Sequence, residues 1–245
     1  MSNKNRWKEI WSKKTLISDG HQNIEDLFIQ MKIADGYDAL GNLKITYLDF
    51  KAQFDDILYH LENCCNGRSI NAQSAFEVGC GCGPNLLLLQ DKGLIVGGID
   101  YSETLIQSAR KFIKTDDLTV GEAVDLGVLP PPTQYDVVFS KGVFCYFESE
   151  EYASKVMELM IKKSKFSIGI LDCLDAEKET EFLTYRREHI KEYDEKYKEL
   201  GKLFLSKKFF CHFASNYNLD ISFTDANLPG YWNSKFVFNV FMYKK

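Results

Sequence analysis

Three glycines at alternate positions constrain this chain more than any other feature. They lie in the stretch Glu77-Val78-Gly79-Cys80-Gly81-Cys82-Gly83-Pro84, between a short apolar run and a run of leucines. Glycine adopts positive φ and lets a ligand approach the backbone, and proline suits the first position of a helix. The stretch therefore predicts a buried strand, a tight turn and a helix. In open α/β sheets, turns of this kind bind nucleotides at the carboxyl ends of strands.

The spacing of this turn argues against a dinucleotide as its ligand. The dinucleotide fingerprint is G-x-G-x-x-G, with a pyrophosphate at the helix N-terminus. Here the third glycine comes one residue early, and Glu77 precedes Gly79 by two positions. A carboxylate beside the loop disfavours a pyrophosphate and favours a ligand with a cationic or hydrogen-donating end. The alternative is a tight strand–helix turn that binds no ligand.

Three further segments follow the turn in order. Residues 94–100 predict a second buried strand that ends at Asp100, which lies 21 residues after Gly79. An acid at about this interval meets the ribose hydroxyls in nucleotide-binding units, although Asp100 would also serve as an ordinary helix N-cap. Glu122-Ala123 follows another short segment, and residues 135–140 are a β-branched run led by an aromatic-Asp pair. The whole spacing favours the ribose role for Asp100.

In this order, the four segments resemble the motifs of class I S-adenosylmethionine-dependent methyltransferases. The resemblance implies that Glu77 and the glycine loop hold the methionine part of the cofactor, and that Glu122-Ala123 lies beside its adenine. It also implies S-adenosylhomocysteine as the product. The cofactor contacts expected on this basis are Glu77, Gly79, Cys80, Gly81, Gly83, Asp100, Tyr101, Glu122, Ala123 and Ser140.

Alternating strand and helix patterns predict a parallel sheet in the middle of the chain. Strands are expected near 74–79, 94–100, 117–121, 135–140 and 166–172, and helices near 84–92, 102–114 and 150–163. Residues 175–203 are rich in Glu, Lys and Arg and predict one long solvated helix. Two last strands, 219–223 and 235–243, have only a loop between them and should pair antiparallel. The predicted class is α/β: a seven-stranded, mostly parallel sheet with an antiparallel C-terminal hairpin and helices on both faces.

The first 70 residues have helical character. We therefore expect an N-terminal helical cap over residues 1–70 and a Rossmann-like methyltransferase domain over residues 71–245. The break at Asp35-Gly36-Tyr37-Asp38, between two of the cap's helices, predicts a lid hinge. In many small-molecule methyltransferases such an extension covers the cofactor and forms part of the acceptor pocket. The alternative is a cap that only buries the surface of the sheet.

Charge and composition exclude several classes of partner. The net charge of −5 argues against nucleic-acid binding, which usually requires a basic face. No apolar run approaches the ~20 residues that cross a bilayer, and the N-terminus shows no signal-peptide core, so we expect a cytoplasmic protein. The seven cysteines form no C-x-x-C pair, which favours reduced buried thiols over a metal site. The expected partner is a small-molecule acceptor, with the protein a monomer or homodimer.

Residues that act on the methyl acceptor are harder to identify. An acceptor hydroxyl usually needs a general base, whereas an anionic oxygen does not. Related enzymes often carry a histidine after the fourth strand, where this chain has Lys141 and Cys145. The catalytic candidates are Asp172, His189, Tyr146 and Lys141, and the substrate-binding candidates are Tyr37, Lys141, Arg186, Arg187, Tyr231 and Asn233. The alternatives are a loop or N-cap acid for Asp172, a solvated helix face for His189 and the two arginines, and simple turn chemistry for Asn233.

The sequence as a whole predicts methyl transfer to an oxygen of a small, polar, anionic molecule. The charged segment, the turn at 227–234 and the last strand resemble a bacterial small-molecule subgroup associated with surface polysaccharides, including capsular phosphoramidate. The alternatives are N-methylation of a small amine or protein side chain, a cofactor-binding partner subunit without activity, and a nicotinamide oxidoreductase.

Overall fold

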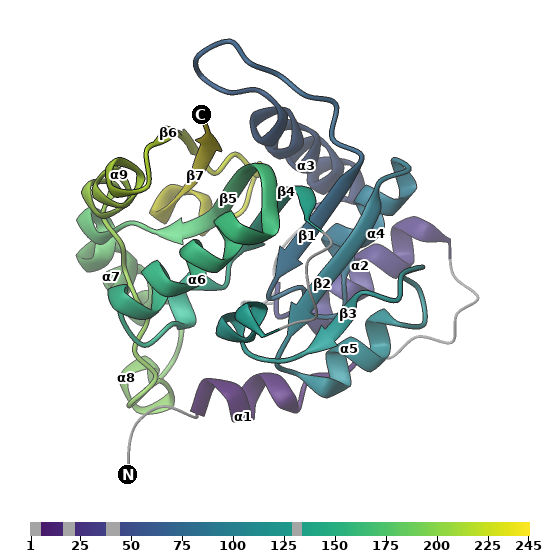
Figure 1. Cartoon of the computed structure of the whole chain (residues 1–245). Helices are drawn as coiled ribbons and strands as arrows, with labels where there is room; N and C mark the ends of the chain where they lie inside the picture. The colour runs from purple at the N-terminus through teal and green to yellow at the C-terminus, as the bar shows by residue number, and fades with distance from the viewer. Residues whose placement is uncertain (1–5, 17–22, 38–44, 129–133) are drawn as a thin grey trace.

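A computed structural model describes residues 6–16, 23–37, 45–128 and 134–245 of the chain. Its sheet has seven strands in the order β3-β2-β1-β4-β5-β7-β6, with helices on both faces (Figure 1). The strands are β1 (Ser74–Val78), β2 (Ile95–Asp100), β3 (Leu118–Val120), β4 (Tyr135–Lys141), β5 (Ser164–Leu174), β6 (Leu219–Asp225) and β7 (Val237–Lys244). The α-helices are α1 (Arg6–Ser12), α2 (Ile24–Ala34), α3 (Tyr47–Glu62), α4 (Pro84–Asp91), α5 (Glu103–Ala109), α6 (Glu150–Lys163), α7 (Glu179–His189), α8 (Tyr193–Lys196) and α9 (Lys207–Asn216). Short 3₁₀ turns are η1 (Ala123–Gly127), η2 (Phe144–Tyr146), η3 (Ala176–Lys178) and η4 (Ser234–Phe236).

The strand order places a switch point at the middle of the sheet. β1 pairs in parallel with both β2 and β4, so the chain runs outward on one side and then returns to build the other. β5 pairs in parallel with β4, whereas β7 lies antiparallel between β5 and β6. The predicted sheet and its C-terminal antiparallel strands are confirmed. In such sheets, ligands bind outside the carboxyl ends of the strands at the switch point, which here are the ends of β1 and β4.

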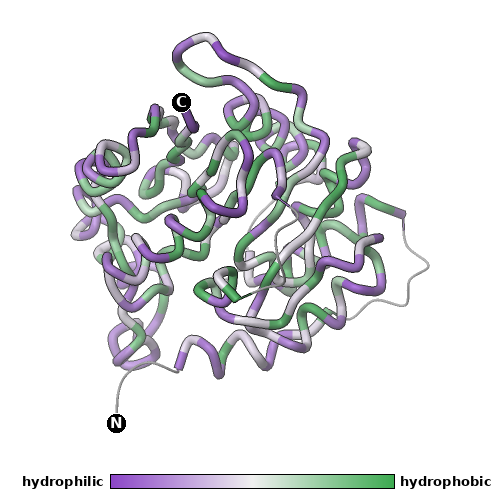
Figure 2. Tube along the Cα trace, viewed as in Figure 1, coloured by the Kyte–Doolittle hydropathy of each residue, from purple (hydrophilic) through white to green (hydrophobic). Residues whose placement is uncertain are grey.

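Two hydrophobic layers hold the sheet. On one face, α2, α3, α4 and α5 pack against residues such as Ala75, Val137 and Phe139. On the other face, α6 and α9 pack against residues such as Phe76 and Val138. Figure 2 shows the hydrophobic residues gathered along the central strands and the hydrophilic ones on the outlying helices. The alternation of inward-facing residues along each strand therefore divides the core between the two helix layers.

The predicted long helix over residues 175–203 is wrong. This segment forms η3, then α7, which ends at His189, and then the single-turn α8. Glu192 and Glu199 adopt left-handed backbone conformations, with φ of 56° and 65°, and such residues end a right-handed helix. The bend folds α8 back toward α7, and Arg186 is buried where a solvated helix would expose it.

Three smaller differences concern element boundaries. The helix expected to reach residue 114 ends at Ala109, where short i→i+3 bonds replace the helical pattern. The helix α9 was not predicted, although Ser206 caps its N-terminus and apolar residues recur along it. Asp172 lies inside β5 rather than at its end, at a register shift between Ile170 and Cys173. Asp38, in the predicted hinge, lies outside the described residues.

Candidate active site

The glycine loop after β1 uses its own backbone donors within the protein. Its glycines have left-handed backbones, with φ of 75° at Gly79, 54° at Gly81 and 85° at Gly83. The amides of residues 79, 80 and 83 donate to the carbonyls of Ile99 or Cys80. The amide of Gly81 donates to Asp100 Oδ2 at 2.9 Å, and that of Cys82 donates to Asp35 Oδ1, just after α2, at 3.1 Å. A phosphate-binding loop needs free amides, so this loop does not fit a pyrophosphate.

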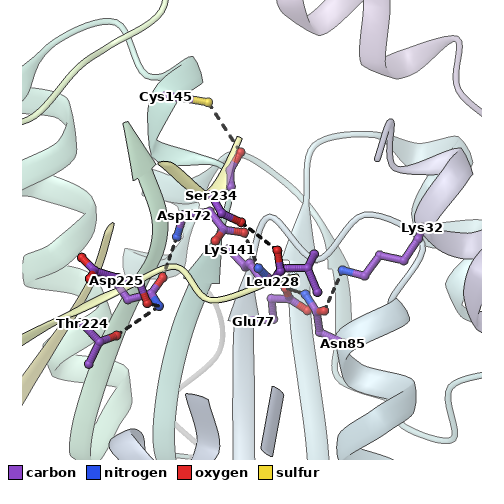
Figure 3. Close-up of polar contacts among 12 residues, drawn as sticks. Lys32, Glu77, Asn85, Lys141, Cys145, Asp172, Thr224, Asp225, Leu228 and Ser234 are labelled. Carbon is purple, nitrogen blue, oxygen red and sulfur yellow. Dashed lines mark hydrogen bonds and ion pairs between the residues drawn. The ribbon is translucent and has the colours of Figure 1, made fainter. Parts of the chain in front are cut away.

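Behind the loop, Glu77 lies at the end of a buried relay of polar side chains. Asn85, in the first turn of α4, donates from Nδ2 to Glu77 Oε1 at 2.6 Å and accepts at Oδ1 from Lys32 Nζ at 2.9 Å (Figure 3). Glu77 is 1% exposed, and its second oxygen, Oε2, has no hydrogen-bond partner among the described residues. Burial raises the pKa of Glu77 to about 8. The carboxyl group can therefore take a hydrogen-bond donor, and a cationic donor would favour its charged form.

The helix α2 contributes two charged side chains that were not predicted as site residues. Lys32 is buried on α2, and burial together with the charge of Lys141 lowers its pKa to about 8. Asp35, just after α2, accepts from the Cys82 amide at 3.1 Å, and burial raises its pKa to about 7. Asp35 also fills the space that a side chain at Gly81 would need. The position of Asp35 in the predicted hinge was the one sequence clue to this contact.

At the ends of β2 and β3, the predicted ribose and adenine residues lie beneath α1. Asp100 is largely buried and accepts from the Gly81 amide at Oδ2 and from the Ser102 amide at Oδ1, at 2.8 Å, which leaves a lone pair on each oxygen for a further donor. Glu122 forms an ion pair with Lys8 of α1. It is the N-cap of η1, whose first residue is the predicted contact Ala123. The hydroxyl of Tyr101 lies 3.5 Å from a carbonyl of α1. Figure 1 shows α1 running across this edge of the molecule, between α8 and α5.

On the other side of the switch point, β4 and β5 bring Lys141 and Asp172 together. Their side chains form an ion pair, with 7% and 16% of the side-chain surface exposed (Figure 3). Asp172 has a left-handed backbone, φ 54°, and its amide donates to Asn239 Oδ1 at 3.0 Å. Asn239, itself buried on β7, donates onward to Thr224 Oγ1 at 3.2 Å. A strained acidic residue held by its neighbours is typical of functional sites.

Ser140 is positioned differently from the other predicted cofactor contacts. It precedes Lys141 on β4 and is fully buried, and its hydroxyl donates to the Val78 carbonyl at 2.8 Å. Its side chain therefore ties β4 to β1 beneath the glycine loop. The structure shows this staple, whereas a contact of Ser140 with cofactor stays a prediction.

The charge of Asp172 acts on Tyr231, a predicted substrate contact that neighbours two further tyrosines. The rings of Tyr37 and Tyr231 lie 5.7 Å apart, and burial, followed by the charge of Asp172, raises the pKa of Tyr231. Tyr146 lies in η2 after β4, and its hydroxyl pKa is raised by burial and by Cys145. Asn233 lies in the turn between β6 and β7, and its Oδ1 is buried without a hydrogen-bond partner among the described residues. Tyr231 thus lies within electrostatic reach of Asp172, Tyr146 and Tyr37, while the roles of these three tyrosines toward an acceptor stay predictions.

The three predicted residues on α7 have different surroundings. Arg186 is 6% exposed and lies among aromatic rings. Arg187 points to the surface, where its Nε pairs with Asp194 at 3.0 Å. His189 is exposed, and its Nδ1 lies 2.8 Å from the Tyr185 carbonyl while its ring stacks on that tyrosine at 3.9 Å. Arg187 and His189 therefore lie on the outer surface of α7, and the structure does not show either beside the Lys141–Asp172 pair.

Within the described part of the chain, the seven cysteines are free thiols. Burial raises the pKa of the Cys80 and Cys82 thiols, which keeps both protonated. Across the same residues, no group of three or more His, Cys, Asp or Glu side chains could hold a metal ion. No described helix is both long and apolar enough to cross a bilayer.

Comparisons with known proteins agree with this geometry. A family profile described as a methyltransferase domain matches residues 76–167, which run from β1 into β5. No curated protein matches the chain. Among solved structures, the magnesium protoporphyrin IX methyltransferase ChlM from Synechocystis PCC 6803, with bound SAM, has a TM-score of 0.57 at 12% identity and covers 100% of this chain and 98% of its own.

Two further structures share the fold. The plantazolicin methyltransferase BamL, in complex with a triazolic desmethylPZN analog and SAH, has a TM-score of 0.61 at 15% identity, with 88% of this chain and 91% of that chain covered. A SAM-dependent methyltransferase from Archaeoglobus fulgidus has a TM-score of 0.54 at 15% identity, with 80% and 93% covered. Residues 76–167 are thus similar to a methyltransferase domain, and the chain shares its Rossmann-like fold with these solved methyltransferases.

Proposed function

We propose that this protein transfers a methyl group from S-adenosylmethionine to an oxygen of a small, polar, anionic molecule. The observation that carries the donor assignment is the unpartnered Oε2 of Glu77, buried behind a glycine loop whose amides are all used internally. Such a site rejects a pyrophosphate and suits the ammonium of a methionine group. Glu77 would accept from that ammonium, and the loop's backbone would lie against the methionine chain.

The rest of the donor site extends along the ends of β2 and β3. Asp100 has one lone pair left on each carboxylate oxygen, which suits two adjacent ribose hydroxyls. Tyr101, Glu122 and Ala123 would border the adenine, and α1 would cover it. When bound, the sulfonium supplies an activated methyl group, and the protein's part is to position the acceptor and exclude water.

For the acceptor side, we assign the base to Asp172 and its orientation to Lys141. Lys141 ends β4 and Asp172 lies two residues before the end of the neighbouring strand β5, and β4 is paired with β1, which precedes the glycine loop. Lys141 would orient the Asp172 carboxylate through their ion pair, and Asp172 would accept the proton of an acceptor hydroxyl. Tyr37, Tyr231 and Tyr146 would border the acceptor. The exposed position of His189 supports Asp172 over it as the base.

We place the acceptor among intermediates of surface-polysaccharide biosynthesis, carrying a phosphate, phosphoramidate or carboxylate, and the reaction in the cytoplasm. This setting rests on the resemblance of the segment after β5 and of the turn before β7. The structural neighbours named above act on a porphyrin and on plantazolicin, so their fold accommodates acceptors of very different shape.

Titration calorimetry tests the donor assignment. S-adenosylmethionine and S-adenosylhomocysteine should both bind, and Glu77→Gln should weaken binding by ~10- to 100-fold, because a hydrogen bond to a charged group contributes about 1.5–3 kcal/mol. The control Glu150→Gln removes an exposed acid from α6 and should bind normally. Absence of binding to the folded wild-type protein at millimolar ligand would overturn the proposal.

Release of S-adenosylhomocysteine tests the acceptor assignment. Candidate hydroxyl-bearing sugar phosphates and sugar acids are incubated with the donor, and product is measured. With an accepted substrate, Asp172→Asn should reduce kcat by ~100- to 10,000-fold, the usual contribution of a general base, and should leave affinity for S-adenosylhomocysteine unchanged. An Asp172→Asn enzyme with normal turnover would refute the base assignment.

A further inference from the structure

Arg186 is a buried cation without a carboxylate partner among the described residues. It is 6% exposed, and its guanidinium lies over four aromatic rings: Tyr197 at 4.7 Å, Tyr193 at 5.1 Å, Phe182 at 5.5 Å and Trp232 at 5.8 Å. Its neighbour on α7, in contrast, forms an exposed ion pair with Asp194. A buried charge is normally paired, because removing it from water is costly. The arginine that needs an anion therefore lacks one.

Two hydrogen-bond donors in this aromatic group have no acceptor. Arg186 Nε and Trp232 Nε1 are both buried, and neither has a partner among the described residues. Aromatic faces attract the charge of a guanidinium, but they do not satisfy N–H groups that could donate to oxygen. Each unsatisfied buried donor carries a desolvation penalty of about 1–3 kcal/mol. An oxyanion with two oxygens would accept from both.

A cavity adjoins the aromatic rings that surround Arg186, although neither Arg186 nor Trp232 is among the residues that line it. It has a volume of about 510 Å³ and is bounded by α7, α8 and the segment that follows them. Phe182, Tyr193 and Tyr197 line the cavity and also surround Arg186. Sites for small ligands commonly have volumes of about 300–1,000 Å³ and mostly aromatic or apolar walls with a few polar groups. The lining of this cavity combines aromatic and apolar residues with six charged side chains, the acids Glu179, Asp194 and Glu199 and the cations Arg187, Lys198 and Lys202.

A second cation connects this cavity with the acceptor side of the sheet. Lys202 lines the cavity, and its Nζ lies 3.9 Å from the ring centre of Tyr146 and 3.5 Å from Cys145 Sγ. The positive charge of Arg186 also acts on the Tyr146 hydroxyl, against the effect of burial. Lys202 thus links the lining of the cavity with Tyr146 and Cys145 of η2, the turn that follows β4.

We propose that Arg186 and Trp232, a buried cation and a buried N–H donor without acceptors among the described residues, form an oxyanion-binding site that holds a carboxylate or phosphate of the methyl acceptor. The assignment of this ligand as the acceptor rests on the proposed function. In this proposal the anion anchors the acceptor and is not itself the methylated group. Arg186 and Trp232 thereby determine which acceptors bind.

Calorimetry without any methyl donor tests this site. The probes are benzoate and phenyl phosphate, which carry a carboxylate and a phosphate on the same ring, with benzamide as the neutral analogue. Both anions, or one of them, should bind, and benzamide should not. Arg186→Gln should weaken anion binding by at least ~10-fold, because it removes a charge-assisted hydrogen bond. The stronger of the two anions identifies the group that the acceptor carries.

Two further variants separate binding from folding. Trp232→Phe keeps an aromatic ring and removes the Nε1 donor, so the variant should fold normally. Its affinity for the anion should be about three- to tenfold lower, which corresponds to the loss of one hydrogen bond. Arg68→Gln removes an exposed arginine between α3 and β1 and should change nothing. If Arg186 only held α7 against α8, Trp232→Phe would leave anion affinity unchanged, and that result would overturn the inference.

A parallel titration with S-adenosylhomocysteine keeps the two proposals distinguishable. Binding of S-adenosylhomocysteine together with no binding of either anion, or with equal binding of benzamide, overturns the anion site and leaves the donor assignment intact. Binding of an anion that depends on Arg186 and Trp232, without binding of S-adenosylhomocysteine, overturns the proposed function and supports the anion site.

Discussion

The two halves of the sheet edge are built in different ways. At the ends of β1 and β2, polar side chains bond to groups close by in the sequence: Glu77 to Asn85, and Asp100 to the amides of Gly81 and Ser102. At the ends of β4 and β5, the contacts join distant segments, as in the set Lys141, Asp172 and Asn239. We call these regions the donor half and the acceptor half, after the function proposed for each. The donor half is built mainly from β1, β2 and the residues next to them, with Lys32 and Asp35 added by α2 and the residue after it, whereas the acceptor half joins segments from across the fold.

Under the proposed function, this difference separates the binding of the methyl donor, which all such enzymes share, from the binding of an acceptor that is particular to this protein. The donor half has internally satisfied amides and one unpartnered carboxylate oxygen, which suits a single kind of ligand. The acceptor half combines an acid with a strained backbone, cations surrounded by aromatic rings, and buried hydrogen-bond donors without partners among the described residues. These residues come from β4, β5, α7 and the turn before β7. Function in such folds is determined by side chains attached to a shared framework. Variation after β5 would change the acceptor and leave the donor half intact.

The largest effect that tests this comparison is expected at Lys141. Lys141→Met leaves the mostly buried Asp172 without its partner and should reduce the free energy of unfolding by about 3–5 kcal/mol. Asp172→Asn should also destabilise, and the double variant should lose less than the sum, because neither charge is left alone. Denaturant unfolding measures all three. Asparagine tolerates the left-handed backbone at this position.

A matched pair on the same strands provides the control. Lys165 and Asp136 also join β5 to β4, but 54% of the Lys165 side chain is exposed. Lys165→Met should change the free energy of unfolding by less than about 1 kcal/mol. If Lys141→Met were equally mild, the acceptor half would not hold a buried charge pair, and its distinction from the donor half would disappear.

Sequence patterns predicted the donor half better than the acceptor half for the same reason. The strand, the glycine turn and the acid at position 100 act through neighbours in the chain, so their spacing alone located them. Lys32 and Asp35 were missed because a helix about 45 residues earlier brings them to the loop, and no local pattern marks that contact. Conversely, the strand order followed from the alternation of strands and helices and the final hairpin.

The segment after β5 shows where sequence reasoning failed. Its charged composition predicted one solvated helix, but the four rings that surround Arg186 come from α7, α8 and the turn before β7. Burial of that arginine is a tertiary effect, which overrides the local preference of a charged helix. The left-handed position before α8 is occupied by Glu192 rather than by glycine or asparagine, so no residue type marked the end of the helix.

A smaller effect concerns the pH dependence of donor binding. Burial raises the pKa of Glu77 from its ordinary value of 4.5 to about 8. A bound ammonium favours the carboxylate, so binding releases a proton below pH 8. Affinity for S-adenosylhomocysteine should fall as pH decreases from 8 to 6, by up to about tenfold per pH unit, or about 1.4 kcal/mol. Calorimetry at pH 6, 7 and 8 measures this trend.

The sign for the ligand-free protein is opposite. Between pH 4.5 and about 8, the folded state holds the Glu77 proton more tightly than the unfolded state does, so stability falls as pH rises through this range. Glu77→Gln should flatten both trends. A wild-type affinity that is independent of pH would contradict a donor half organised around this carboxyl group, and calorimetry in buffers of different ionisation enthalpy would confirm the released proton.

The smallest effect is expected at α1, which covers the donor half without being buried in it. No residue of α1 is buried, and its ion pair from Lys8 to Glu122 leaves 40% and 33% of the two side chains exposed. Exposed pairs contribute about 0.2–1 kcal/mol and are screened by salt. Lys8→Met should therefore weaken the binding of S-adenosylhomocysteine by no more than about fivefold, and the difference from the wild-type affinity should vanish at ~1 M salt. Lys13→Met, which removes an exposed lysine just after α1, is the control. A loss above tenfold that persists in salt would show that α1 is an integral part of the donor half. That half would then include an N-terminal helix and would not be built mainly from β1, β2 and the residues next to them.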